Sequence, residues 1–191
     1  MSDPGAFSGV DWASNTVNVI KNIADNVEPI QRLITAAAYI LGLLFGFKAL
    51  YTLKIYGEAR TMMSSNATAK EPLTYLFVSA VLLMSPKAVE VLLATTFGSS
   101  SILQYGPITS SNQPIEEIFG SGSEVAKPLM MIIQTVGYVA FVRGWILIAR
   151  ASAHGQQPGG SGKGLMHVFG GILAINIVST LQIVNNTIFG S

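Results

Sequence analysis

Four long stretches of apolar residues carry very little charge, and they limit the possible fold more than any other feature of the sequence. They cover residues 33–53, 73–97, 128–151 and 165–189. At about 1.5 Å per residue, a helix of about 24 residues is roughly 36 Å long and can cross a hydrocarbon core of about 30 Å. The sequence therefore predicts an all-α integral membrane protein with four apolar helices, arranged as two helical hairpins.

The composition supports this prediction. Of the 191 residues, 50% are hydrophobic and only 11% are charged, whereas soluble domains carry about 25% charged residues. The alternative, a soluble bundle with unusually apolar helices, fits the composition less well. A net charge of +1 excludes a nucleic-acid binder that acts through bulk charge. Because the chain has no cysteine, it has no disulfide, thiolate zinc site or cysteine nucleophile.

The second and fourth apolar stretches contain polar interruptions. In the second, Pro86, Lys87 and Glu90 indicate either a kinked span or two half-helices of which the first has about thirteen residues. The fourth has no formal charge and is predicted as one continuous span. It carries amide side chains at Asn176, Gln182, Asn185 and Asn186.

The N-terminal part differs from the rest because residues 10–32 alternate apolar and polar side chains at helical spacing. This pattern predicts an amphipathic helix that Pro29 kinks or ends, and its mixed, acidic polar face favours packing on protein over lying among lipid headgroups. The predicted organisation is an N-terminal segment (1–32), a first membrane hairpin (33–97), a Ser/Gly/Pro-rich acidic linker (98–127) and a second membrane hairpin (128–191).

The distribution of Lys and Arg predicts the orientation in a membrane. With four spans, the loops at 54–72 and 150–164 share one side, and that side has more cations: Lys54, Arg60, Lys70, Arg150 and Lys163. The other side has Lys21, Arg32 and Lys127. We therefore expect both loops in the cytoplasm and both termini in the periplasm of a bacterial inner membrane. The similar placement of cations before each loop also raises the possibility of a parallel internal repeat.

No group of residues indicates catalysis, a cofactor or a metal. The segment from Gly159 to Gly164 contains Lys163 but lacks the Ser or Thr that a phosphate-binding loop places after its lysine. His154 and His167 have no cysteine or nearby carboxylate with which to bind a metal, and the pair Glu116 and Glu117 fits a solvated loop. The prediction is a protein that is not an enzyme.

Charged residues inside the apolar stretches are a sharper signal, because each costs about 2.5–3.5 kcal/mol at the centre of a membrane helix. Lys87 and Glu90 are three residues apart and are predicted to pair. Lys48 and Arg143 either extend to the membrane surface or contact lipid phosphate or a water-filled lumen. In the fourth stretch, Gly170 and Gly171 are expected to allow close packing of helices. The Asn176 amide is expected to form a hydrogen bond between helices.

The second hairpin resembles a known family. The segment 143–176, with Ala153-His154-Gly155, a Gly/Gln-rich loop and Leu165-Met-His-Val-Phe-Gly-Gly-Ile-Leu-Ala-Ile-Asn176, is similar to the IcmC/DotE- and TraQ-like small membrane proteins of type IVB secretion and I-type plasmid conjugation systems. The resemblance covers about a fifth of the chain through these residues and the rest through its hydropathy layout. It implies a non-catalytic structural subunit of a conjugation or secretion apparatus.

In design, this hairpin also resembles the pilins of other type IV systems, in which a short cationic loop joins two apolar helices and faces a lumen that contains phospholipid. The resemblance implies that the chain forms homo-oligomers and contacts other subunits of the apparatus. It implies no cofactor other than bound phospholipid. DNA or protein substrate would be present only in transit through a pilus or an inner-membrane base. The phosphate-facing or lumen-facing residues would be Arg143, Arg150 and Lys163, with counterparts in the first hairpin at Lys48, Lys54 and Arg60.

Two other functions remain open from the sequence. A small transporter or ion channel could use Lys87, Glu90 and Arg143 as a charge relay. A membrane assembly factor would help to build the apparatus and be absent from the finished machine.

Overall fold

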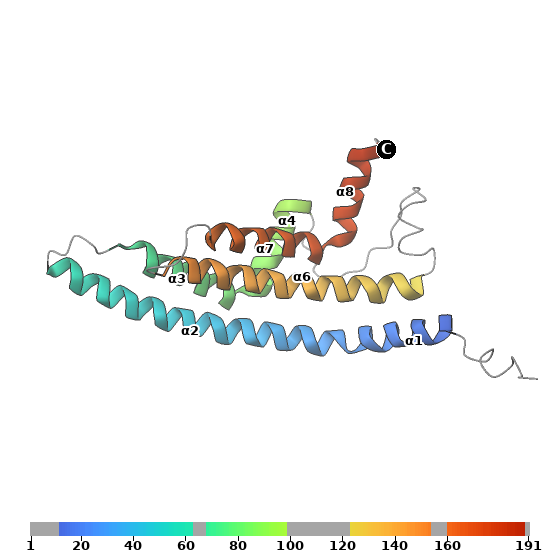
Figure 1. Cartoon of the computed structure of the whole chain (residues 1–191), viewed down its shortest axis with the longest axis horizontal. Coiled ribbons are helices and arrows are strands. Elements are labelled where there is room, and N and C mark those ends of the chain that lie inside the picture. Colours follow the sequence, from blue (N-terminus) through green and yellow to red (C-terminus); the bar gives the residue numbers. More distant parts are fainter. Residues whose placement is uncertain (1–11, 63–67, 99–122, 154–159, 190–191) are drawn as a thin grey trace, which may run out of the picture.

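A computed structural model describes residues 12–62, 68–98, 123–153 and 160–189, and each regular element in these ranges is an α-helix. The predicted all-α fold is confirmed for this part of the chain. In chain order, the helices are α1 (Trp12–Asp25), α2 (Val27–Thr61), α3 (Lys70–Leu83), α4 (Ser85–Phe97), α6 (Ser123–Ala151), α7 (Gly160–Ile175) and α8 (Ile177–Phe189) (Figure 1).

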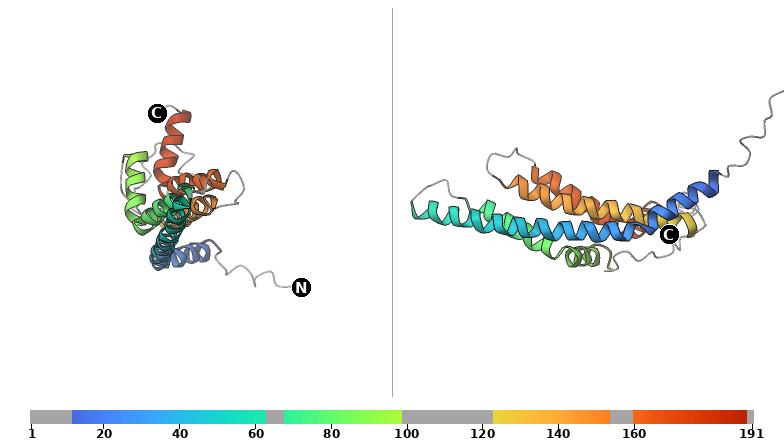
Figure 2. Two further views of the ribbon diagram at one scale, coloured as in Figure 1. Left: turned by 90° about the vertical axis from the view of Figure 1, so that its left-hand side faces the viewer. Right: turned by 90° about the horizontal axis from the view of Figure 1, so that it is seen from below.

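The same order of helices occurs twice. In each half, a long helix is followed by a shorter antiparallel helix, a sharp break and a second short helix: α2, α3 and α4 first, then α6, α7 and α8. The two long helices α2 and α6 run side by side in the same direction, and α4 and α8 turn to the same side of the bundle (Figures 1 and 2). The chain therefore forms two hairpins in parallel orientation.

The core lies where α3 and α6 meet the other helices. Tyr75 and Leu82 on α3 and Phe141 on α6 are fully buried. Phe45 of α2 stacks on Tyr75, with ring centroids 5.8 Å apart. This stacking packs α2 on α3 within the first hairpin, and the edge contact of Phe77 on α3 with Trp145 on α6, at a centroid distance of 5.6 Å, joins the first hairpin to the second.

Helices α6 and α7 approach each other closely at two pairs of glycines. A methyl group added at Gly144 would lie 2.7 Å from the backbone nitrogen of Val168 and 2.8 Å from the carbonyl oxygen of Gly164. One added at Gly171 would lie 2.7 Å from the carbonyl oxygen of Gly137. In each helix the glycines are seven residues apart and thus lie on one face, so they set both the spacing and the register of the hairpin.

The α2–α3 hairpin also uses small residues where its helices meet. A methyl group added at Gly46 would lie 2.9 Å from the Ser79 hydroxyl oxygen, and one at Gly42 would lie 3.0 Å from the backbone nitrogen of Leu83. The buried Ser79 hydroxyl donates a hydrogen bond to the Gly42 carbonyl oxygen over 2.8 Å. Small residues of this kind let helix backbones approach closely, as they do in membrane proteins.

The first helix boundary lies upstream of the predicted one. The helix is interrupted at Asn26, between α1 and α2, and Pro29 lies in the first turn of α2. A proline is well tolerated there because the first backbone N–H groups of a helix have no partner within it. Of the two predicted roles of Pro29, a kink or the end of the helix, the second is therefore wrong, because the interruption lies three residues earlier, at Asn26. The expected division between residues 32 and 33 falls inside α2. Helix α1 packs against α6, which agrees with packing on protein.

The second apolar stretch is divided at Met84, where α3 and α4 meet at 90°. Pro86 lies in the first turn of α4 and has no N–H with which to continue the hydrogen bonds of α3. Of the two predicted arrangements, a kinked span or two half-helices, the structure has the second.

The fourth apolar stretch is also broken, which the sequence analysis did not predict. Helices α7 and α8 meet at 92° around Asn176. The Asn176 side-chain oxygen accepts a hydrogen bond from the backbone N–H of Ser179 at 3.4 Å, and the Thr180 hydroxyl donates to the Leu173 carbonyl oxygen at 2.8 Å. Asn176 therefore caps the start of α8, in place of the predicted role between helices.

Within the described ranges, two helical segments are each long and apolar enough to cross a membrane, and the number rises to four if each bent pair is one span. The segments are Asn18–Thr61 and Pro128–Ala151, and only 17% and 28% of their most apolar windows are buried within the chain. Lipid or other protein must therefore cover most of this surface if it is to be kept from water.

The glycine contacts give a prediction for the stability of the second hairpin. Gly144→Ala should lower the free energy of unfolding by about 1–3 kcal/mol, because the added methyl group overpacks the α6–α7 contact. Gly170→Ala is the matched control, since nothing lies within 4 Å of its added methyl group, and alanine at a helical glycine should stabilise by about 0.5–1 kcal/mol. Thermal unfolding of the protein in detergent, followed by circular dichroism, measures both. Equal shifts for the two variants would contradict close packing at Gly144.

Candidate functional site

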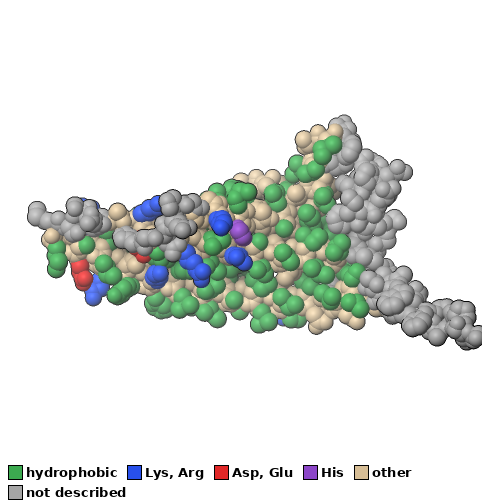
Figure 3. All heavy atoms as spheres, viewed as in Figure 1, with side chains coloured by type: hydrophobic (Ala, Val, Ile, Leu, Met, Phe, Trp, Pro, Cys, Tyr) green, Lys and Arg blue, Asp and Glu red, His purple; other side chains and the backbone are tan. Residues whose placement is uncertain are grey.

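Cations gather toward one end of the molecule. On the face drawn in Figure 3, Lys and Arg side chains lie over the half that carries the α2–α3 and α6–α7 connections, and hydrophobic side chains cover most of the rest. Helices α2 and α6 both end at this end of the molecule because they run in the same direction. The structure thus combines the cations of two distant loops into one charged end.

Within this end, Arg143 and Lys163 lie at similar heights on the α6–α7 hairpin. Each directly precedes one member of the Gly144–Gly164 contact. Because equivalent positions of two antiparallel helices in contact are related by a local twofold axis, both side chains project from the same flank of the hairpin. Both residues are exposed, and His167 lies one turn beyond Lys163 with its Nδ1 2.8 Å from the Lys163 carbonyl oxygen.

Arg150 extends this group along α6, because it lies seven residues after Arg143 and therefore on the same face of the helix. Among the described residues, no hydrogen bond or ion pair involves the side chain of Arg143, Arg150 or Lys163. We call these three residues the basic flank. Its three cations are exposed and are not neutralised by any residue in the described part of the chain.

The three predicted counterparts in the first hairpin are arranged differently, because each has a partner on a neighbouring helix turn or helix. Lys48 Nζ lies 4.5 Å from the centre of the Tyr75 ring. Lys54 Nζ lies 3.7 Å from a Glu58 carboxylate oxygen, and Arg60 donates to the Tyr56 hydroxyl over 3.0 Å. The six predicted cations therefore divide into a partnered set, Lys48, Lys54 and Arg60, and the unpartnered basic flank.

Lys87 and Glu90 form an ion pair on α4, with 2.9 Å between Nζ and Oε2. Lys87 borders a cavity together with Trp145, and Trp145 projects about 200° around α6 from Arg143. Lys87 and Arg143 thus lie on opposite sides of α6, so the geometry gives no support to a charge relay through both.

The two glycines predicted to pack helices have different surroundings. Gly171 is buried against the backbone of α6, whereas Gly170 is exposed and points away from it. His154, Glu116 and Glu117 lie outside the described residues. Within the described ranges, no group of three or more His, Asp or Glu residues could hold a metal ion.

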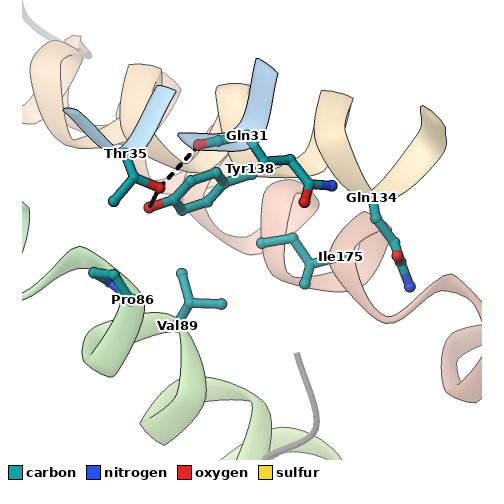
Figure 4. A pocket seen from close by; sticks show the side chains of 7 residues that line it. All are labelled: Gln31, Thr35, Pro86, Val89, Gln134, Tyr138 and Ile175. Carbon is teal, nitrogen blue, oxygen red and sulfur yellow. Dashed lines mark hydrogen bonds between the residues drawn. The ribbon is translucent and has the colours of Figure 1, made fainter. Parts of the chain in front are cut away.

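The sequence analysis missed a polar junction between the two hairpins, at the level of the helix breaks. A cavity of about 110 Å³ is lined by Gln31 and Thr35 of α2, Pro86 and Val89 of α4, Gln134 and Tyr138 of α6 and Ile175 of α7 (Figure 4). These residues come from four helices, so no local sequence pattern marks them. Both helix breaks border the cavity. Pro86 lies two residues after Met84, where α3 and α4 meet, and Ile175 directly precedes Asn176, where α7 and α8 meet.

Hydrogen bonds between helices cross this junction. The Thr35 hydroxyl donates to the Tyr138 hydroxyl oxygen over 3.2 Å, and the Ser85 hydroxyl lies 3.2 Å from the same atom. Gln31 donates from Nε2 to the Thr135 hydroxyl oxygen over 2.8 Å. Tyr138 therefore connects α6 with α2 and with the first residue of α4. The seven lining residues carry no formal charge, and their amide and hydroxyl groups can donate and accept hydrogen bonds.

Comparison with known proteins identified no relative: no family model matches the chain, and no curated protein or solved structure has a significant match.

The junction gives a second prediction for stability. Tyr138→Phe keeps the ring and removes the hydroxyl that Thr35 and Ser85 approach, so it should lower the free energy of unfolding by about 0.5–1.5 kcal/mol. Tyr51→Phe is the matched control, because the Tyr51 side chain is 66% exposed. Thermal unfolding in detergent distinguishes the two variants. If Tyr138→Phe melted like the control, the hydroxyl contacts would contribute nothing to the junction.

Proposed function

We propose that the chain is a non-catalytic structural subunit of a type IVB conjugation or secretion apparatus, embedded in a bacterial inner membrane. It assembles with copies of itself and other subunits into the transfer conduit, as a conjugative pilus subunit or as part of the inner-membrane base. The resemblance of residues 143–176 suggests the apparatus. The observation that carries the mechanism is the unpartnered basic flank beside a large apolar surface.

The apolar surface supports placement in a membrane. Along α2, the side chains of Leu33 and Phe47 are each 69% exposed, and Leu44 is 59% exposed. A soluble monomer rarely exposes a continuous apolar surface of this kind. Lipid chains would cover the part of it that neighbouring subunits leave open.

The basic flank supports contact with phosphate. Arg143, Arg150 and Lys163 project from one side of the α6–α7 hairpin without an anionic partner in the described part of the chain. Cations in this setting pair with an anion or extend to the headgroup region, and each contributes about 1 kcal/mol of attraction to an anionic membrane surface. Lipid phosphates, at the membrane surface or in the lumen of an assembled conduit, supply the matching charge.

The parallel arrangement of α2 and α6 supports four crossings. Helices α2 and α6 begin at the same end of the molecule. The chain must therefore cross back between the end of α2 and the start of α6, and it does so if α3 and α4 together make one crossing. The same reasoning for α7 and α8 brings the C-terminus to the periplasmic side with the N-terminus. The excess of Lys and Arg then lies in the cytoplasm.

Charge reversal tests the role of the basic flank. In cells that carry the whole transfer system, Arg143→Glu combined with Lys163→Glu should reduce transfer, because the change replaces attraction to phosphate by repulsion at both positions. From about 1 kcal/mol per charge, the affinity for anionic lipid should fall roughly tenfold or more. Transfer frequency is the readout, and the amount of chain in the membrane fraction shows that insertion is intact.

The matched control reverses two partnered cations, Lys54→Glu and Arg60→Glu, at the same end of the molecule. It should reduce transfer less than the first pair. Unchanged transfer with Arg143→Glu and Lys163→Glu, at normal membrane levels, would refute the proposed role of the flank.

Mass spectrometry of filaments sheared from the same cells distinguishes the two places in the apparatus. A pilus subunit would be a main species of the filaments, whereas a base component would remain in the membrane.

A further inference from the structure

The cavity at the polar junction contains a buried amide without a partner. Gln134 on α6 borders this cavity of about 110 Å³ (Figure 4), and only 6% of the residue is exposed. None of the described residues forms a hydrogen bond with the Gln134 side chain, although other bonds cross the junction. A buried amide without a partner is costly, because it has given up its hydrogen bonds to water. Gln134 therefore indicates that the cavity has a hydrogen-bonding occupant.

Two further polar side chains border the same space. The Gln31 amide donates from Nε2 to the Thr135 hydroxyl oxygen, and its Oε1, which is not used in that bond, can accept. Tyr138 brings a hydroxyl to the cavity from the next turn of α6. The Gln134 amide itself has two N–H donors and one acceptor oxygen. An occupant that satisfies these groups must therefore both donate and accept hydrogen bonds.

Charge and size select the occupant. Because the seven lining residues carry no formal charge, a bound ion would have no opposite charge to compensate for the hydration that it loses. An apolar chain would leave the Gln134 amide without a partner. A volume of about 110 Å³ holds a few water molecules, since one water occupies about 30 Å³ in the liquid. Water also supplies both the donors and the acceptors that the amides require.

We propose that the cavity at the polar junction is a binding site for a small cluster of water molecules. The waters accept from the Gln134 N–H groups and donate to the side-chain oxygens of Gln134 and Gln31, so that they bridge α6 and α2 beside both helix breaks. Gln134 lies six residues after Pro128, inside a segment long and apolar enough to cross a membrane. Buried water of this kind is part of the structure and costly to remove. The proposal is independent of the role in a conjugation or secretion apparatus.

Nuclear magnetic resonance tests the proposal directly, with the full chain labelled with ¹⁵N-glutamine in perdeuterated detergent. The side-chain amide signals of Gln134 are identified by their loss in Gln134→Met. These signals should show nuclear Overhauser effects from water, with the sign that is typical of a long-lived bound molecule. Rotating-frame spectra separate such contacts from proton exchange, which has the opposite sign. A Gln134 amide without contacts to water would overturn the proposal.

A variant that fills the cavity tests the location of the water. Thr35 borders the cavity, so Thr35→Leu should reduce the water contacts of Gln134 by at least half. Thr52→Leu is the matched control and should leave them unchanged. Both threonines lie on α2 and donate over 2.9 Å to the carbonyl oxygen four residues earlier, but Thr52 does not border this cavity. Unchanged contacts in Thr35→Leu, or an equal loss in both variants, would refute the site.

Thermal unfolding in detergent provides a second readout. Gln134→Met keeps the length of the side chain and removes its hydrogen bonds to water, so it should lower the Tm by about 2–4 °C. In a dry cavity the same change would remove an unsatisfied amide, and a raised Tm would therefore overturn the proposal. Replacing NaCl by KCl or choline chloride at equal ionic strength should leave the Tm of the unaltered chain unchanged. A Tm that depended on sodium would show that an ion occupies the cavity, and would refute the water cluster.

Discussion

The close contact between α6 and α7 at their glycines determines much of the remaining structure. Gly144 faces Gly164, and Gly137 faces Gly171, at distances that leave no room for a side chain. This register brings Arg143 and Lys163 to one flank of the hairpin. It also directs Trp145 to the opposite side, toward the first hairpin. One backbone contact thus places the basic flank and Trp145 on opposite sides of the hairpin.

The two helix breaks add a second constraint. Pro86 and the capping side chain of Asn176 end the antiparallel helices of the two hairpins, and α4 and α8 both turn through about a right angle. The breaks border the same polar junction, where Tyr138 contacts both Thr35 and Ser85. The breaks therefore lie beside hydroxyl and amide side chains of the same chain, and irregular backbone inside a membrane is tolerated where protein buries it.

The sequence predicted the features that depend on local patterns. The apolar stretches, the amphipathic N-terminal helix and the interruption near Pro86 all follow from periodicity, hydropathy and the chemistry of proline. The break at Asn176 was missed because the sequence alone does not distinguish an asparagine inside an apolar helix from one that caps a helix. The hydrogen bond from the Thr180 hydroxyl to the Leu173 carbonyl oxygen, which spans the break, is visible only in the structure. The sequence placed the interruption at Pro29, three residues after its position at Asn26, because proline fits the first turn of a helix as well as its end.

The candidate site was predicted less completely, because its character depends on contacts between distant residues. Six cations were predicted as one set, yet only the fold shows that Lys48 lies beside the Tyr75 ring while Arg143 has no partner in the described chain. The polar junction draws on four helices, so it leaves no local signature in the sequence.

The most direct test of the account is the membrane orientation of the two hairpins. The chain has no cysteine, so single cysteines can be introduced at exposed positions near the two connections, Thr61→Cys and Ser161→Cys, and in α1, Asn22→Cys. In spheroplasts, a membrane-impermeant maleimide should label Asn22→Cys alone, and all three should react after the membrane is opened. Labelling of one connection from outside and not the other, or of all three in intact spheroplasts, would contradict two parallel hairpins that cross the membrane.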